Sequence, residues 1–119
     1  MMKLTTSVVV AAVILAVFFA GAYYLSLPPK YFDNASPVLY FYQDSCTHCI
    51  AMKPILYQLA DEGYRLKGIN FASQPDLYTQ YGVTGTPTFV GTNTGTRLDG
   101  EQNITALRQF LDDNKAKIG

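Results

Sequence analysis

The segment from residue 38 to residue 49 reads VLYFYQDSCTHC. Its first five residues are all apolar or aromatic, which is typical of a strand buried on both faces of a sheet. Residues 43–45 are polar and end the strand, and either Asp44 or Ser45 can cap a helix that the sequence predicts over residues 46–62. A buried strand leading into a helix that opens with two cysteines is therefore the centre of the predicted fold.

The predicted helix begins with Cys46 and Cys49, which are the only cysteines of the chain. Unpaired N–H groups and a partial positive charge at a helix N-terminus stabilise a thiolate, so we expect the pKa of Cys46 to lie below the free value of about 8.5. Cys49 lies one turn further in and is shielded. The pair therefore predicts a redox disulfide: Cys46 attacks a substrate disulfide, Cys49 resolves the mixed disulfide, and the reverse steps donate a disulfide.

His48 lies between the two cysteines and is the only histidine of the chain. Its imidazole and the neighbouring N–H groups can favour the Cys46 thiolate. A stabilised thiolate stabilises the dithiol state, which makes the disulfide more oxidising. The alternative is that His48 is an exposed residue with little influence on the cysteines.

Further elements follow the first helix at short intervals. Alternating polarity over residues 64–71 predicts a second strand, and residues 74–81 predict a short helix. Two more strands, over residues 88–92 and 96–99, flank a hairpin turn. The first two strands require parallel pairing through a right-handed crossover, whereas the last two form an antiparallel hairpin.

The last predicted helix follows Gly100 and is amphipathic. Asn103 can cap it, and its apolar stripe consists of Ile104, Leu107, Phe110 and Leu111. The order strand, helix, strand, helix, strand, strand, helix predicts an α/β fold with helices on both faces of the sheet.

The N-terminal residues 1–27 carry a second strong signal. Lys3 precedes an almost wholly apolar run, residues 8–27. A helix needs roughly 20 such residues to span the hydrocarbon core of a bilayer, and this run is of that length. Tyr23 and Tyr24 suit the membrane interface, so the run predicts an uncleaved signal anchor. The alternative is a signal peptide that is cleaved near Ala22, after which the protein is secreted.

Both interpretations place the rest of the chain on the extracytoplasmic side, periplasmic or extracellular, where disulfides persist. Residues 28–36 predict a short stiff tether because Pro28 and Pro29 cannot continue a helix. Residues 37–119 then form a single exported domain. We expect this domain to be a monomer.

Composition argues against several other functions. Nine basic and nine acidic residues give a net charge of zero, which makes electrostatic nucleic-acid binding unlikely. Two cysteines and one histidine are too few for a four-ligand zinc site, and we predict no metal site and no cofactor. Soft thiolates also bind Cu(I), so a copper-handling module is an alternative, with Met52 on the same helix expected to face the core.

Two motifs resemble the thioredoxin superfamily. Residues 46–56, CTHCIAMKPIL, look like its active-site helix, including the proline five residues after the second cysteine. Residues 81–90, YGVTGTPTFV, resemble the loop that carries a cis proline beside the active-site cysteines. The resemblance implies that Pro87 is cis and that the Thr86 backbone pairs with an extended protein substrate. It also assigns Thr47 to the substrate-binding surface.

The resemblance covers about residues 37–115, because the Asp99-Gly100 turn and the last helix also match. It implies a minimal thioredoxin-like fold: a four-stranded mixed sheet with three helices on both faces, preceded here by an N-terminal hydrophobic helix. The strand and helix that open full thioredoxins are missing, since the stretch between residues 27 and 38 is too short to supply them.

Two positions depart from the thioredoxin pattern. Ser45 replaces the tryptophan that precedes the first cysteine. Tyr40 replaces a buried acid that in the family helps proton transfer at the second cysteine, so a water molecule or the Tyr40 hydroxyl would have to substitute. His48 makes the dipeptide similar to that of the disulfide-donating Dsb-type and protein disulfide isomerase enzymes.

We therefore predict a protein dithiol-disulfide oxidoreductase, with Cys46, Cys49 and His48 as catalytic residues. It exchanges disulfides with protein substrates and an unidentified redox partner, and the sequence favours disulfide donation or isomerisation. Three alternatives remain: a thioredoxin-like reductant, a Cu(I)-handling module in the same compartment, and a non-catalytic anchored domain that binds a partner.

Overall fold

The structure is a computed structural model that describes residues 6–119. Its elements follow the order predicted from the sequence. They are α1 (Thr6–Ser26), β1 (Val38–Tyr42), α2 (Thr47–Asp61), β2 (Lys67–Asn70), α3 (Pro75–Gln80), β3 (Thr88–Gly91), β4 (Arg97–Asp99) and α4 (Ile104–Asp113).

The four strands form one mixed sheet in the order β2-β1-β3-β4. Strand β1 pairs in parallel with β2 and antiparallel with β3, which in turn pairs antiparallel with β4. The predicted parallel first half and antiparallel C-terminal hairpin are confirmed. Strand β1 is interior to the sheet, which explains why all but the last of its residues are buried.

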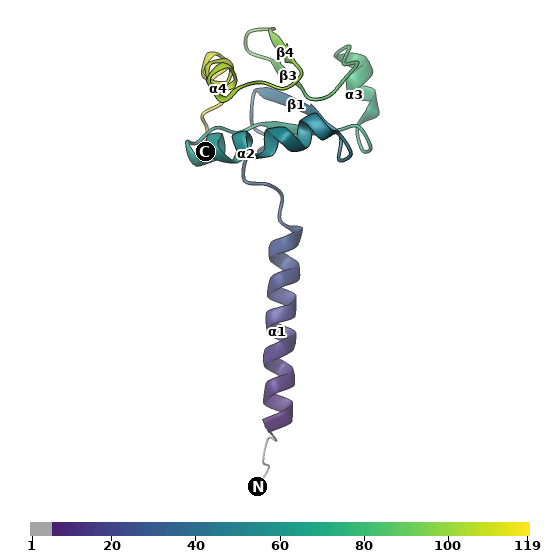
Figure 1. Cartoon of the computed structure of the whole chain (residues 1–119), viewed down its shortest axis with the longest axis vertical. Coiled ribbons are helices and arrows are strands. Elements are labelled where there is room, and N and C mark those ends of the chain that lie inside the picture. The colour runs from purple at the N-terminus through teal and green to yellow at the C-terminus, as the bar shows by residue number, and fades with distance from the viewer. Residues whose placement is uncertain (1–5) are drawn as a thin grey trace.

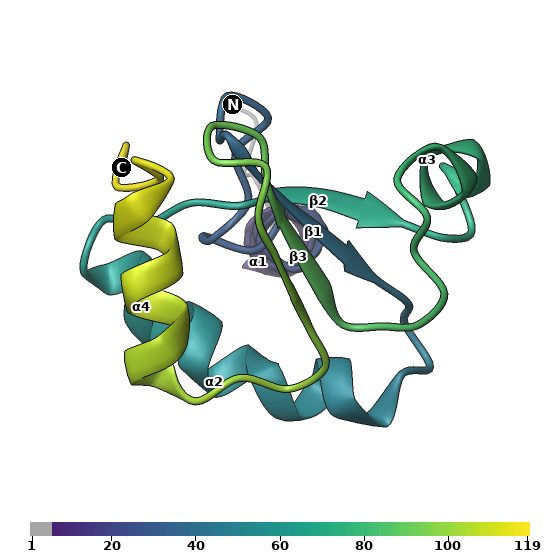
Figure 2. The same ribbon diagram turned by 90° about the horizontal axis from the view of Figure 1, so that it is seen from above.

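Helices cover both faces of this sheet, as predicted (Figure 2). Along β1 the side chains alternate between two cores. Val38 and Tyr40 belong to the larger core, together with buried residues of α2 and α4. Leu39 and Phe41 belong to the smaller core, together with Tyr78 of α3. The chain therefore has the three-layer α/β arrangement that the sequence predicts.

The second strand is shorter than the predicted residues 64–71. The backbone of residues 64–66 forms hydrogen bonds to other partners: the Arg65 N–H donates to the Ala116 carbonyl at 2.9 Å, and Tyr64 forms an isolated bridge with Lys117. Only the four residues of β2 lie beside β1. The alternating pattern therefore indicates extended chain correctly but does not specify its pairing partner.

Residues 31–33 form an unexpected bridge at the outer edge of β2. Phe32 pairs with Leu66 in parallel, and the Leu66 N–H donates to the Tyr31 carbonyl at 2.7 Å. Tyr31 is buried in the larger core, and the Ser36 hydroxyl donates to the Arg65 carbonyl at 2.8 Å. The second half of the segment expected as a tether thus packs against the sheet.

Helix α1 extends away from the sheet and its covering helices (Figure 1). Its window Thr6–Tyr23 has a mean hydropathy of 2.3 and no buried residue. It is long enough and apolar enough for either a signal anchor or a signal peptide. Lys3, on which the predicted orientation rests, lies outside the described residues.

Candidate active site

Cys46 caps α2 with its own sulfur. The helix starts at Thr47, one residue later than predicted, so the predicted caps Asp44 and Ser45 are wrong. Cys46 has extended backbone angles (φ −75°, ψ 113°), and its Sγ accepts a hydrogen bond from the Cys49 N–H at 3.1 Å. The sulfur takes the place of the side-chain oxygen that usually caps a helix.

This capping position lowers the pKa of the Cys46 thiol. Partial burial acts in the opposite direction, but hydrogen bonds from the Cys49 and Thr86 side chains and from the His48 and Cys49 backbone outweigh it. Each of these bonds stabilises the thiolate more than the thiol. The predicted direction of the shift is confirmed.

Cys49 is the shielded partner, with only 4% of its surface exposed. Burial, followed by the hydrogen bond with Cys46, raises the pKa of the Cys49 thiol. Both cysteines are free thiols in this structure. The two sulfurs therefore differ in access and in acidity, with Cys46 the more accessible and the more acidic.

The Thr86–Pro87 loop lies against the cysteines, as predicted. The Thr86–Pro87 peptide bond is cis, and the Cys46 thiol donates a hydrogen bond to the Thr86 carbonyl at 3.5 Å. Pro87 is buried and Thr86 is half-buried, while Thr47 is exposed as the first residue of α2. A hollow beside this loop is lined by Gly82, Thr84, Gly85, Thr86, Pro87, Thr88, Arg97, Asp99 and Gly100.

The His48 imidazole contacts an acidic residue that sequence reasoning missed. Its Nδ1 lies 2.5 Å from the Glu101 Oε1, and both side chains are largely exposed. The contact of His48 with the Cys46 sulfur is made by its backbone N–H. Nothing in the local sequence signals this pair, because 53 positions separate the two residues.

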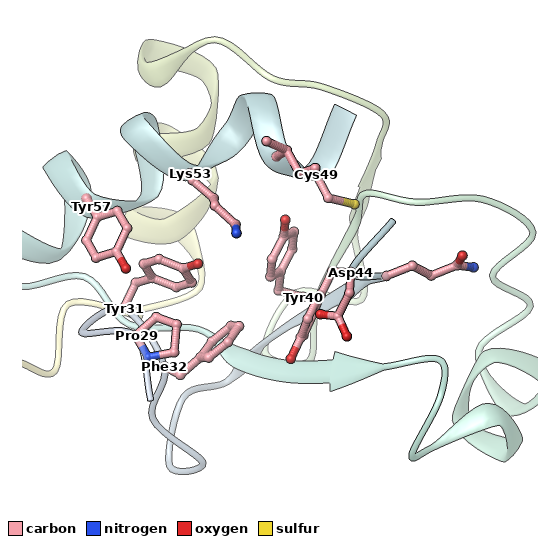
Figure 3. A pocket seen from close by; sticks show the side chains of 11 residues that line it. Pro29, Tyr31, Phe32, Tyr40, Asp44, Cys49, Lys53 and Tyr57 are labelled. Carbon is pink, nitrogen blue, oxygen red and sulfur yellow. The ribbon is translucent and has the colours of Figure 1, made fainter. Parts of the chain in front are cut away.

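Behind Cys49 lies a cavity of about 220 Å³ that we call the tyrosine cavity (Figure 3). Tyr40 extends into it from β1, and its hydroxyl points toward α2, between the Cys49 sulfur and the Lys53 side chain. The cavity is lined by Pro29, Tyr31, Phe32, Tyr40, Tyr42, Gln43, Asp44, Cys49, Ile50, Lys53 and Tyr57.

Met52 faces the core, as predicted. It is 1% exposed, and its sulfur accepts a hydrogen bond from the Gln102 N–H at 3.4 Å. Among residues 6–119, no group of three or more His, Cys, Asp or Glu side chains is placed to hold a metal ion. The thiols are therefore the only soft donors that the described site presents to a ligand.

A central strand followed by a helix that begins at a Cys-x-x-Cys pair, facing a cis-proline loop, defines a dithiol-disulfide exchange site. Comparison with known proteins agrees. The family model for thioredoxin matches residues 30–113. The chain therefore belongs to the thioredoxin family, and with its Cys46–Cys49 pair it is a dithiol-disulfide oxidoreductase.

Solved structures give the same result. One similar chain comes from a structural study of the thiol resolving mechanism in yeast mitochondrial 1-Cys peroxiredoxin via glutathione/thioredoxin systems. Its sequence identity to this chain is 30% and its TM-score is 0.56, and the alignment covers 64% of this chain and 76% of that one. Another is a mutant thioredoxin from Halobacterium salinarum, with 25% identity and a TM-score of 0.57, covering 68% of this chain and 77% of that one. A search of curated proteins gave no significant match.

Proposed function

We propose that this protein is a membrane-attached oxidoreductase that donates disulfides to, or isomerises disulfides in, protein substrates on the extracytoplasmic side. The observation that carries the proposal is the set of hydrogen bonds to the Cys46 sulfur in the dithiol state. Interactions that stabilise the thiolate also stabilise the reduced protein, and they make its disulfide a stronger oxidant.

Cys46 is the nucleophile and leaving group in this proposal, and Cys49 is the resolving residue. In donation, a substrate thiolate attacks the Cys46 sulfur of the disulfide form. The Cys46–Cys49 bond breaks, its electron pair stays on Cys49, and Cys49 takes up a proton. A second substrate thiolate then attacks the substrate sulfur of the mixed disulfide, and Cys46 leaves as a thiolate. The substrate loses two electrons, and the protein gains them.

The proposed substrate contacts are Thr86, Pro87 and Thr47. Thr86 is half-buried and in contact with the Cys46 sulfur, Thr47 is exposed next to Cys46 in the chain, and the hollow beside the Thr86–Pro87 loop offers room for an extended chain. A substrate backbone that paired with Thr86 would bring its own sulfur to Cys46. Specificity would then depend on backbone geometry more than on side chains.

His48 contributes through its backbone N–H and, we propose, through the charge of its ring. We expect His48→Ala to make the Cys46–Cys49 couple more reducing. The ring is exposed and paired with Glu101, so the change should be below about 30 mV, which is tenfold in the equilibrium constant of a two-electron couple. A reduction potential equal to that of the wild type would show that the His48 side chain has no influence on the cysteines.

A direct assay of the proposed function mixes the oxidised protein with a reduced, unfolded protein that needs disulfides to regain activity. We expect the wild type to restore activity and Cys46→Ser to abolish the effect. With a substrate protein that already contains disulfides, reduced Cys49→Ser should accumulate mixed disulfides that are visible on a non-reducing gel. Full activity of Cys46→Ser would contradict the proposal and favour a partner-binding domain.

Cu(I) handling and thioredoxin-like reduction are the competing functions. The burial of Met52 leaves only the two thiols of the described site to bind copper, which favours disulfide exchange. One tight Cu(I) per reduced chain, together with no exchange activity, would contradict the proposal. Reduction of insulin disulfides that is faster than disulfide donation would instead support a reductant.

A further inference from the structure

Cys49 gains or loses a proton in every catalytic cycle, yet its sulfur is buried. When it resolves a mixed disulfide it must become a thiolate, and its surroundings favour the thiol. A group beside the sulfur must therefore stabilise the thiolate as it forms and connect it to solvent. The titratable side chains around Cys49 and its cavity are Cys46, Tyr40, Tyr78, Tyr31, Tyr42, Tyr57, Asp44 and Lys53.

The Tyr40 hydroxyl is the group best placed for this role. Tyr40 is 2% exposed, and its ring is fixed by stacking on Phe89 at 4.9 Å and on Tyr42 at 5.4 Å between ring centroids. Burial and, in addition, the charge of the neighbouring Cys49 raise the pKa of Tyr40. The hydroxyl therefore stays protonated, and its position beside the Cys49 sulfur (Figure 3) makes it available there as a hydrogen-bond donor.

The tyrosine cavity supplies the connection to solvent. Its volume of about 220 Å³ is several times the roughly 30 Å³ that one water molecule occupies in the liquid. Its lining includes tyrosine side chains and two exposed charged residues, Asp44 and Lys53. These groups can hold water between the Tyr40 hydroxyl and the surface.

We propose that the Tyr40 hydroxyl is a catalytic group of the resolving step: it donates a hydrogen bond to the forming Cys49 thiolate while water in the tyrosine cavity carries the proton away. The inference rests on the proposed disulfide exchange. Tyr40 stands at the position where thioredoxins have a buried acid, and its hydroxyl takes a different part in the same step.

The Cys49 thiol releases its proton to water in the cavity, and the thiolate attacks the Cys46 sulfur of the mixed disulfide. The Cys46–substrate bond breaks as the Cys46–Cys49 bond forms, and the substrate sulfur leaves with the electron pair as a thiolate that solvent protonates. Tyr40 keeps its own proton throughout. The substrate disulfide gains two electrons, and the protein dithiol loses them.

The test follows both sulfurs in one stopped-flow reaction of the reduced, full-length protein with a chromogenic aryl disulfide. The first equivalent of aryl thiol reports attack by Cys46, and the second reports resolution by Cys49. Cys49→Ser should remove the second phase only. If the wild type itself gives neither phase, the proposed disulfide exchange fails before Tyr40 is tested.

Tyr40→Phe keeps the stacked ring and removes only the hydroxyl. We expect it to leave the first phase unchanged and to raise the pH midpoint of the second phase by about one unit or more, a tenfold or larger change in proton affinity. The rate of the second phase at pH 7 should fall about three- to tenfold, because a more basic thiolate is also a better nucleophile.

Tyr64→Phe is the matched control. Tyr64 is another buried tyrosine of the same core, beyond the opposite end of α2, and its hydroxyl donates to Asp112. The control should leave both phases unchanged. An unshifted midpoint in Tyr40→Phe, or equal shifts in both variants, would overturn the proposal. If Tyr40→Phe does not fold, 3-fluorotyrosine at position 40 provides a stronger hydrogen-bond donor instead. It should lower the pH midpoint of the second phase, and an unchanged midpoint would overturn the proposal.

Discussion

Cys46 and Cys49 are one helical turn apart, yet their surroundings shift their proton affinities in opposite directions. Cys46 lies at the helix start, where free N–H groups converge on its sulfur. Cys49 lies one turn further along the helix and is shielded from solvent. This asymmetry is a property of position in the helix, and it assigns different steps of one reaction to chemically identical side chains.

Alkylation should reveal the asymmetry directly. We expect iodoacetamide to modify Cys46 of the reduced protein first, with a pH midpoint below about 8.5, the value of a free cysteine. Below its midpoint the rate should fall as Cys46 is protonated. Cys49, measured in Cys46→Ser, should have a midpoint above about 8.5. Mass spectrometry after limited modification identifies the site, and equal midpoints would contradict the asymmetry.

At the scale of elements, the site depends on how α2 is held against α4. The Arg108 guanidinium donates to both carboxylate oxygens of Glu62, at 2.8 Å each, and lowers the pKa of that carboxyl. Glu62 is the C-cap of α2, so this ion pair joins the end of the active-site helix to α4.

The stability contribution of this ion pair should depend on pH. A lowered carboxyl pKa in the folded state stabilises the protein above the unfolded pKa of about 4.3 and loses its effect as pH falls through the folded value. We expect a double-mutant cycle with Glu62→Gln and Arg108→Gln to give a favourable coupling at pH 7 that disappears in acid. Coupling that persisted well below the folded pKa would rule out this electrostatic explanation.

A close contact fixes the β3–β4 hairpin to the end of α4. The side chain of buried Asn114 accepts a hydrogen bond from the Thr94 hydroxyl at 2.9 Å, and a Cβ at Gly91 would collide with the same Oδ1. We expect Gly91→Ala to destabilise the fold by about 1–3 kcal/mol, the usual effect of overpacking. Gly85→Ala, whose Cβ would meet no atom within 4 Å, is the control in denaturant unfolding. Equal stabilities would contradict this contact.

Hydrophobic patterning predicted the order of elements because each strand and helix buries a continuous apolar face. The pattern could not locate contacts that involve a single residue pair. The bridge of Phe32 with Leu66 and the pairing of His48 with Glu101 each join distant positions that carry no shared periodicity. The capping role of Cys46 was also missed, because the usual cap residues Asp44 and Ser45 stand directly before it.

For the whole molecule, the apolar α1 and the redox site are separated by a short segment that is partly docked on the sheet. Residues 27–30 are the only ones between the end of α1 and buried Tyr31. An uncleaved α1 would therefore hold the site close to a membrane surface. The tyrosine cavity includes Pro29 and Tyr31, so the docked segment also forms part of the wall behind Cys49.

Membrane attachment is tested by fractionation of cells that express the full chain. We expect the protein to remain with the membranes in high salt and at alkaline pH, because burial of an apolar helix of this length in lipid does not depend on charge. Mass spectrometry should find an intact N-terminal segment. A soluble protein that starts near residue 23 would show that the segment is a cleaved signal peptide.

The reduction potential of the Cys46–Cys49 couple tests the proposed function most directly. Equilibration of the full chain against glutathione buffers, with the dithiol fraction counted by thiol alkylation, gives this value. If hydrogen bonds to the Cys46 thiolate make the protein a disulfide donor, the potential should lie above about −200 mV. A potential of about −270 mV, the value of thioredoxin, would contradict disulfide donation and identify a reductant.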